Sequence, residues 1–232
     1  MDSYWESIKH TLPDDDTRQF TAEMILRKHL DTSRPAAFLD LGCGTGNFVD
    51  TVRAMSANVE YHGLDIEVSP ESNARVRSDA VFKHYDGVDI PYGAERFDIV
   101  FSNQVFEHVR YPERLMCDVG RVLRRGGKFL GSVSQLEPYH SLSLWNFTIY
   151  GFNTLVESAG LKVIEFRPGI DAYSLIARSF RNRDKKYRRF FQEEGLLHRR
   201  IEREGRKNNV SGRKILHRKL TFSGHFCFVA EK

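Results

Sequence analysis

The sequence predicts an α/β protein built around a doubly wound parallel sheet. Short apolar segments alternate with segments of helical periodicity from about residue 36 to residue 168, which is typical of successive strand–helix–strand units. The first apolar segment, residues 37–41, runs into a glycine-rich turn and then a helix, as at the ligand-binding edge of such sheets. At roughly 150 residues per domain, the 232-residue chain is expected to be one domain, 1–232.

The N-terminal region, residues 1–35, is expected to be a helical cap. Asp16 or Thr17 would begin its helix, because a short polar side chain accepts hydrogen bonds from the first free amides. Pro35 would end it, because the residue before a proline avoids the helical conformation.

The remaining elements follow from periodicity and glycine stops. Seven strands are expected, at residues 37–41, 60–65, 81–85, 97–102, 128–133, 161–166 and 225–230. Helices are expected at residues 47–55, 112–123 and 148–159. Gly126 and Gly160 follow two of these helices, where glycine is a typical stop signal.

A basic segment lies between the last two expected strands. The chain has 35 basic and 31 acidic residues, but residues 178–219 hold 16 basic and only 5 acidic ones. This segment is predicted to be a helical insert. Two interpretations remain open: a solvated helical face, or a surface that contacts a phosphate-bearing partner.

The composition excludes several classes of protein. Three cysteines are too few and too scattered for a disulfide framework or a zinc site, and no metal site is predicted. No apolar run approaches the roughly 20 residues of a membrane span, and the first ten residues lack the apolar core of a signal peptide. A cytoplasmic protein is therefore expected.

The glycine-rich turn predicts a nucleotide-like ligand. Glycines allow the ligand to approach the backbone, and the amides at the start of the next helix face the same crevice. The spacing Gly-x-Gly-x-Gly differs from the dinucleotide pattern Gly-x-Gly-x-x-Gly. Asp40, just before the turn, would repel a pyrophosphate. The electrostatics therefore favour S-adenosylmethionine, which has cationic groups and no phosphate, over NAD.

Two further carboxylates follow neighbouring strands. Asp65 lies 19 residues after Gly46, near the spacing at which an acidic residue accepts hydrogen bonds from ribose hydroxyls. Asp86 is placed to accept from an adenine amino group, and Gly87 leaves room for the ring. By itself, Asp86 is more typical of a turn residue.

Several motifs resemble class I S-adenosylmethionine-dependent methyltransferases. They are Asp-Leu-Gly-Cys-Gly-Thr-Gly from Asp40, Gly-Leu-Asp-Ile from Gly63, Tyr-Asp-Gly from Tyr85, Ile-Pro-Tyr with the later Phe-Asp-Ile-Val, Gln-Val-Phe-Glu-His-Val from Gln104, and Leu-Arg-Arg-Gly-Gly from Leu123. The resemblance implies a Rossmann-like seven-stranded sheet, mostly parallel, with an antiparallel last strand between the fifth and sixth.

The resemblance also implies roles for individual residues. Asp40 and the turn glycines would serve the methionine part of the cofactor, Asp65 the ribose and Asp86 the adenine. The full predicted set of cofactor-binding residues is Asp40, Gly42, Cys43, Gly44, Gly46, Asp65, Ile66, Asp86, Gly87 and Asn103.

Two histidines are candidates for chemistry on the methyl acceptor. A hydroxyl acceptor must lose its proton, so a nearby base is expected. His108 follows the fourth strand and His140 follows the fifth, so both should lie at the crevice. His108 could instead simply shape its loop, and the segment around His140 could be an ordinary covering loop.

The acceptor is predicted to be a sugar or glycan intermediate. Glu137, Tyr139 and Trp145 form a polar and aromatic group around His140, which suits a sugar ring. The Glu-Pro-x-His segment also resembles methyltransferases associated with bacterial surface polysaccharide synthesis. A phosphate-bearing or lipid-linked glycan would also explain the basic insert.

Alternative functions stay open at this point. The protein could methylate RNA, or a lipid or quinone. It could also be a non-catalytic assembly protein that keeps the cofactor-binding fold. RNA ranks lower, because the sequence contains no recognised RNA-binding motif.

Overall fold

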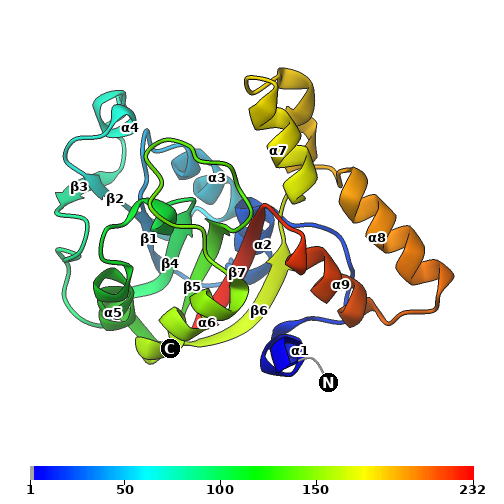
Figure 1. Ribbon diagram of the computed structural model, residues 1–232. Coiled ribbons are helices and arrows are strands. Elements are labelled where there is room, and N and C mark those ends of the chain that lie inside the picture. The colour runs from blue at the N-terminus through cyan, green and yellow to red at the C-terminus, as the bar shows by residue number, and fades with distance from the viewer. Residues whose placement is uncertain (1–2) are drawn as a thin grey trace.

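The structure, a computed structural model, describes residues 3–232 and is organised around one seven-stranded sheet (Figure 1). Its strands are β1 (Ala36–Leu41), β2 (Val59–Ile66), β3 (Val81–Tyr85), β4 (Phe97–Asn103), β5 (Leu123–Ser134), β6 (Lys162–Pro168) and β7 (His225–Glu231). The order across the sheet is β3-β2-β1-β4-β5-β7-β6. β7 runs antiparallel to both β5 and β6, and the other pairings are parallel. This confirms the expected fold, including the place of the last strand.

Helices cover both faces of the sheet, as a doubly wound fold requires (Figure 1). One face packs on α2 (Ala22–His29) and α3 (Phe48–Met55), and the other on α5 (Pro112–Val122) and α6 (Ile149–Ser158). β1 is buried along its whole length, because it lies inside the sheet and under helices on both sides. The short α4 (Pro70–Asn73) follows β2.

The N-terminal region differs from the prediction. It contains α1 (Ser3–Ile8) and the 3-10 helix η1 (Lys9–Thr11), and then α2, which begins later than expected. The cap of α2 is Thr21, whose side-chain oxygen accepts a hydrogen bond from Met24 N at 3.2 Å. Neither Asp16 nor Thr17 caps a helix; both belong to the extended segment between η1 and α2.

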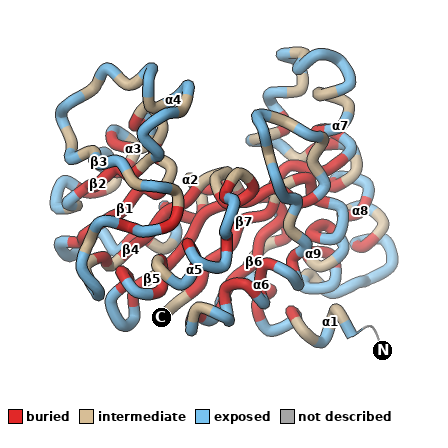
Figure 2. The backbone as a smooth tube through the Cα atoms, turned by 60° about the vertical axis from the view of Figure 1, so that its left-hand side comes forward, coloured by how far each residue is buried: buried red, intermediate tan, exposed pale blue. Residues whose placement is uncertain are grey.

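Four helical segments connect β6 to β7. They are α7 (Ala172–Phe180), η3 (Lys185–Phe191), α8 (Leu196–Lys207) and α9 (Gly212–Thr221). Figure 1 shows them beyond the β6 side of the sheet, with α7 rising above it. Figure 2 shows that their backbone alternates between buried and exposed positions. The connection therefore has its own packed interior, in which Phe190, His198, Ile201 and Leu216 are buried.

The N-terminal segment ties this connection to the sheet. Thr17 Oγ1 donates to Glu202 at 2.6 Å, and Gln19 Nε2 donates to the Phe190 carbonyl at 2.9 Å. Arg167 of β6 is fully buried and donates to Asp16 O at 2.9 Å. The N-terminal segment and the helical connection between β6 and β7 thus pack against each other at the β6 edge of the sheet. Among the described helices, none is both long and apolar enough to cross a bilayer.

Candidate active site

The glycine-rich turn after β1 has the backbone geometry that its sequence requires. Gly42, Gly44 and Gly46 have φ values of +78°, +51° and +82°, in the left-handed region that favours glycine. A β-carbon at Gly42 would lie 2.3 Å from a methyl carbon of Val105, so only glycine fits there. The turn is therefore held against the loop that follows β4.

Asp65 joins the turn to the end of β2. Its Oδ2 accepts a hydrogen bond from Gly44 N at 2.6 Å, and its Oδ1 accepts from Ile66 N at 2.8 Å. Ile66 is exposed, and a β-carbon at Gly87 would lie 3.8 Å from its side chain. Three residues of the predicted ribose and adenine sites therefore lie together: Asp65, Ile66 and Gly87. Each carboxylate oxygen of Asp65 already accepts one backbone hydrogen bond.

Asp86 has the geometry of a turn residue. Its Oδ1 accepts hydrogen bonds from Val88 N and Asp89 N at 2.9 and 2.7 Å, and these bonds lower the pKa of its carboxyl group. Asp86 therefore stabilises the turn after β3, which is the role that is typical of aspartate at such a position. It also lies directly beside Gly87.

Asp40 is more enclosed than its expected role in cofactor binding suggests. Its side chain is almost fully buried, and it accepts a hydrogen bond from the Tyr61 hydroxyl on β2. Burial raises the pKa of this carboxyl group to about 7, and the nearby Asp65 contributes in the same direction. The charge of Asp40 is therefore not displayed in the crevice, where we expected it to attract a cationic ligand.

Cys43 and two arginines complete the surroundings of the turn. Burial raises the pKa of the Cys43 thiol to about 12, so this side chain is a neutral, structural thiol. Arg75 Nη1 donates to Gly44 O at 3.0 Å, and Arg77 Nη1 donates to Gly46 O at 3.0 Å. These arginines, which the sequence analysis did not single out, bring positive charge to the turn.

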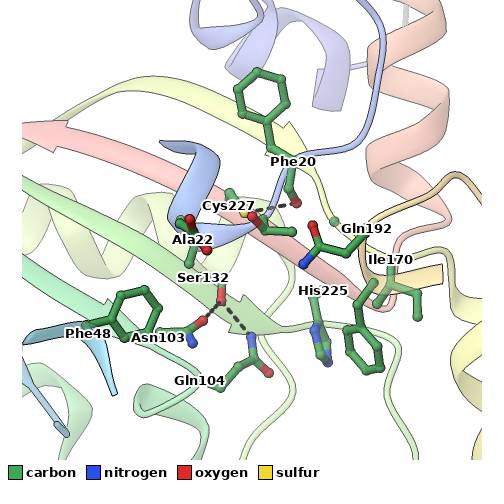
Figure 3. Close-up of a pocket in the computed structure, with 14 residues that line it drawn as sticks. Phe20, Ala22, Phe48, Asn103, Gln104, Ser132, Ile170, Gln192, His225 and Cys227 are labelled. Carbon is green, nitrogen blue, oxygen red and sulfur yellow. Dashed lines mark hydrogen bonds between the residues drawn. The ribbon is translucent and has the colours of Figure 1, made fainter. Parts of the chain in front are cut away.

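A cavity of about 280 Å³ opens next to the ends of β4 and β5 (Figure 3). Its wall contains Asn103, which accepts a hydrogen bond from Ser132 Oγ at 2.7 Å, and Gln104, which donates to the same oxygen at 3.0 Å. Gln104 has a φ of +57°, a strained conformation for a residue other than glycine. The cavity is also lined by Phe20, Thr21, Ala22, Glu23, Phe48, Gly169, Ile170, Phe191, Gln192, His225 and Cys227.

This cavity brings the insert next to a predicted cofactor-binding residue, although the two are far apart in the sequence. Phe191 ends η3 of the insert and Gln192 follows it, and both share the cavity wall with Asn103. Phe20 reaches the same wall from the N-terminal segment. Sequence distance concealed this arrangement, because η3 returns to the sheet just before α8 begins.

The candidate acceptor residues Glu137 and His140 meet beside this cavity, and a third side chain joins them. Glu137 Oε2 lies 2.7 Å from His225 Nε2, and Glu137 Oε1 lies 3.5 Å from His140 Nδ1. The rings of His108 and His140 lie edge to face with their centroids 5.4 Å apart. The two predicted histidines are thus brought together, and His225, which begins β7, completes the group.

Glu107 is the residue in this group that the sequence analysis missed. Its side chain is fully buried beneath the two histidines, and burial raises the pKa of its carboxyl group to about 7. Ser134 Oγ lies 3.0 Å from Glu107 Oε1 and 2.5 Å from Glu137 Oε2. The only signal in the sequence was an acidic residue next to His108. We call Glu107, His108, Glu137, His140 and His225 the carboxylate–histidine cluster.

The predicted aromatic contacts to a sugar are only partly assembled. Trp145 is half exposed, and its indole nitrogen donates to Val109 O at 2.8 Å, so this ring is fixed near His108. Tyr139 is 74% exposed and stands apart from the cluster. A sugar bound at the cluster would therefore meet the Trp145 ring more readily than the Tyr139 ring.

Comparison with known proteins agrees with this geometry. Residues 39–131, which include the turn, β2, β4 and His108, match the family model described as a methyltransferase domain. The fold is that of class I S-adenosylmethionine-dependent methyltransferases. The chain resembles the "S-adenosylmethionine dependent methyltransferase" of Mesorhizobium loti, with a TM-score of 0.57 and 16% identity over 91% of this chain and 98% of that one.

Two further comparisons show how widely the fold is used. The [4+2]-cyclase SpnF superposes with a TM-score of 0.60 at 17% identity, covering 96% of this chain and 86% of that one. The ubiquinone biosynthesis O-methyltransferase of Nitrosococcus oceani is 29% identical over 106 residues, which are 43% of this chain and 44% of that protein. Alignments with the curated relatives span about half of their length, and the family match lies in the part of the chain that carries the glycine-rich turn.

Proposed function

We propose that this protein transfers a methyl group from S-adenosylmethionine to a hydroxyl oxygen of a sugar or glycan intermediate that carries a phosphate group. The observation that carries the proposal is the carboxylate–histidine cluster beside the cofactor turn, with His140 Nδ1 3.5 Å from Glu137. The residues that would hold the cofactor are those around the glycine-rich turn, with Asp65 at the ribose.

The chemistry of the transfer explains why such a cluster is useful. The hydroxyl oxygen attacks the methyl carbon in line with the sulfur, the carbon–sulfur bond breaks, and the hydroxyl proton must leave. His140 is the proposed base, with His108 as the alternative, because both lie at the carboxyl ends of the central strands. Burial and the neighbouring His140 lower the pKa of His108, so the neutral form of His108 is favoured.

The phosphate group is inferred from arginines of the insert. Arg178 Nε is buried and has no hydrogen-bond partner among the described residues, and the Arg178 guanidinium lies 5.4 Å from the centroid of the Phe191 ring, which lines the cavity. Burial, together with Arg183 and Arg188, lowers the pKa of Arg178. Within residues 3–232, none of these three arginines forms an ion pair with a carboxylate. Three unpaired guanidinium groups suit an anion of several oxygens.

A second cavity supports the same interpretation. It has a volume of about 590 Å³ and is lined by Lys185, Lys186 and Arg189 together with aromatic and aliphatic side chains of the insert. Basic side chains around an apolar floor suit a phosphate attached to an apolar carrier. This is the observation that favours a lipid-linked glycan over a free sugar.

Methyl transfer into fractionated cell extract tests the proposal. We expect radiolabel from S-adenosylmethionine in the glycan fraction, with His140→Ala lowering turnover on the order of 10² and changing cofactor affinity little. His108→Ala is the matched comparison, because its ring touches the same space. Label confined to RNA or to free lipid would contradict the glycan assignment. Cofactor binding without methyl transfer into any fraction would contradict the proposal that the protein is a methyltransferase. The [4+2]-cyclase SpnF has a similar fold and a different activity, so this outcome is a real alternative.

A further inference from the structure

Three metal-ligating side chains converge inside the carboxylate–histidine cluster. One ligand atom each from Glu107, His108 and His140 lies within 4.8 Å of the other two. We propose that these three residues bind a divalent metal ion such as Zn²⁺ or Mn²⁺, and that the methyl acceptor reaches this ion. No metal site was expected from the sequence, because the three cysteines are scattered and the pairing of these two loops is a tertiary contact.

The backbone holds the three residues in place from two sides. Glu107 and His108 lie on the 3-10 helix η2 (Phe106–His108), whose His108 N donates to Val105 O at 2.9 Å. The loop that carries His140 returns to the same point, where Leu144 N and Trp145 N both donate to the Glu107 carbonyl, at 2.7 and 3.1 Å. The loops after β4 and β5 are thus pinned together, and their side chains face a common space.

The hydrogen bonds of Glu107 give an independent reason to expect a cation. Glu107 is fully buried, and its Oε2 has no hydrogen-bond partner among the described residues. Its Oε1 shares the single hydroxyl hydrogen of Ser134 with Glu137 Oε2. Glu137 also has His225 beside its Oε2, so Glu107 is the buried carboxylate left short of donors, which is costly unless a positive charge is present. A metal ion coordinated by Glu107 would supply it.

The donor set indicates the class of metal. Two imidazole nitrogens and one carboxylate oxygen suit Zn²⁺ and similar first-row ions, and three protein ligands leave coordination positions open. His140 has Glu137 at its Nδ1, which leaves Nε2 for the ion, and the Leu142 backbone makes a hydrogen bond with His108. Metal-binding histidines commonly have such partners on the second ring nitrogen, because these partners fix the ring orientation.

The role of the ion rests on the proposed function. An acceptor hydroxyl bound at an open position would lose its proton to solvent more readily, because a cation stabilises the alkoxide. The alkoxide oxygen then forms the bond to the methyl carbon as the carbon–sulfur bond breaks, and S-adenosylhomocysteine leaves as a neutral thioether. With the ion bound, His140 coordinates it, and the ion takes over the task that the proposed function gives to His140 as a base.

Calorimetric titration tests the site without cofactor or acceptor, so its result is separate from the test of methyl transfer. The full chain, first dialysed against a chelator, is titrated with Mn²⁺ alone and with Zn²⁺ alone. We expect at least one of them to bind with one ion per chain. Glu107→Gln and His140→Ala should each weaken this binding at least tenfold, while the exposed His10→Ala should leave it unchanged.

A second measurement needs no variant and so does not depend on whether the variants fold. In the NMR spectrum of the unaltered protein, Mn²⁺ should broaden the ring signals of His108 and His140 well before those of His10. The proposal is overturned if neither ion binds, or if binding is as tight in Glu107→Gln and His140→Ala as in the unaltered protein. Broadening of all histidines alike would also overturn it.

Discussion

At the scale of single residues, the site depends on carboxylates with different surroundings. Asp65 faces the crevice and is held by two backbone amides, whereas Asp40 is buried under the turn and Glu107 is buried under two histidines. In the sequence, all three are carboxylates at or just after the end of a strand. Their neighbours in the fold decide which carboxylate faces a ligand and which has a raised pKa.

Asp65 is expected to dominate cofactor affinity. Asp65→Ala should weaken binding of S-adenosylmethionine at least tenfold, about 1.4 kcal/mol, because the variant loses both the ribose acceptor and the support of Gly44 N. Calorimetry provides the measurement, and the neighbouring Glu67→Ala is the control. Equal affinity in Asp65→Ala and the unaltered protein would remove the ribose assignment.

Asp40 is expected to make stability depend on pH. Its folded-state pKa of about 7 lies above the value near 4 of an unfolded chain, so the folded protein binds the extra proton between these limits. The associated stabilisation is complete below about pH 4 and is lost as the pH rises through about 7. The free energy of unfolding should therefore decrease from about pH 5 to about pH 8.

Asp40→Asn isolates this contribution, because the amide oxygen still accepts the Tyr61 hydrogen bond and does not titrate in this range. Urea unfolding at the two pH values measures it. The unaltered protein should lose more stability than the variant between them, by on the order of a few kcal/mol. An identical loss in both proteins would show that Asp40 titrates normally.

At the scale of elements, the insert between β6 and β7 is the part of the chain that distinguishes this site. It supplies Phe191 and Gln192 to the cavity and Arg178 to its surroundings. It is also built into the fold, since Phe190, His198 and Ile201 are buried. Deleting residues 181–213 would therefore remove part of the core, and substitutions of surface charges are the sharper test.

Replacing two unpaired arginines should weaken binding of a phosphate-bearing acceptor. Arg183→Gln combined with Arg188→Gln should raise the apparent KM at least severalfold and reduce its dependence on salt, because fewer charges attract the anion. Cofactor affinity should not change. KM is measured at several salt concentrations with the acceptor isolated from extract.

The matched control removes the same charge from another part of the insert. Arg200→Gln combined with Arg206→Gln alters two arginines of α8 that pair with Glu204 and Glu202 at 2.8 and 2.7 Å. This control should behave like the unaltered protein. If both double variants raise the KM equally, the effect is one of net charge and the arginine site is wrong.

At the scale of the whole molecule, one buried lysine holds three distant segments together. Lys219 of α9 has no exposed surface, and its Nζ donates to Thr17 O at 2.8 Å and to Glu194 at 2.5 Å. Glu202 of α8 lies 2.8 Å from the same nitrogen. The N-terminal segment that reaches the cavity is thus fixed to the insert.

Lys219→Met should therefore destabilise the protein and loosen the cavity wall. Removing the ammonium group leaves two partly buried carboxylates side by side, and we expect a loss of about 3 kcal/mol in the free energy of unfolding. Urea denaturation measures the loss, and hydrogen exchange should show weaker protection around residues 17–21. The exposed Lys214→Met on the same helix should change neither. A stable Lys219→Met with full protection would contradict this account.

The sequence by itself determined the elements whose signals are local. The apolar period placed six of the seven strands within about two residues, because alternation and helical spacing are properties of short segments; the fifth, β5, begins five residues earlier than expected, at Leu123. The glycine-rich turn was predicted because its left-handed conformations require glycine. Glu137 and His140 were expected in one group because they follow the same strand three positions apart, and the structure adds the contact between their side chains.

Only the tertiary structure decided which distant residues share the site. β7 enters the sheet between β5 and β6, so His225 arrives 2.7 Å from Glu137 across 88 positions of sequence. The insert folds back so that Phe191 lines the cavity, and Tyr61 turns Asp40 from an expected surface charge into a buried group. Local patterns carry no information about these contacts, because each one depends on burial of apolar faces that belong to separate parts of the chain.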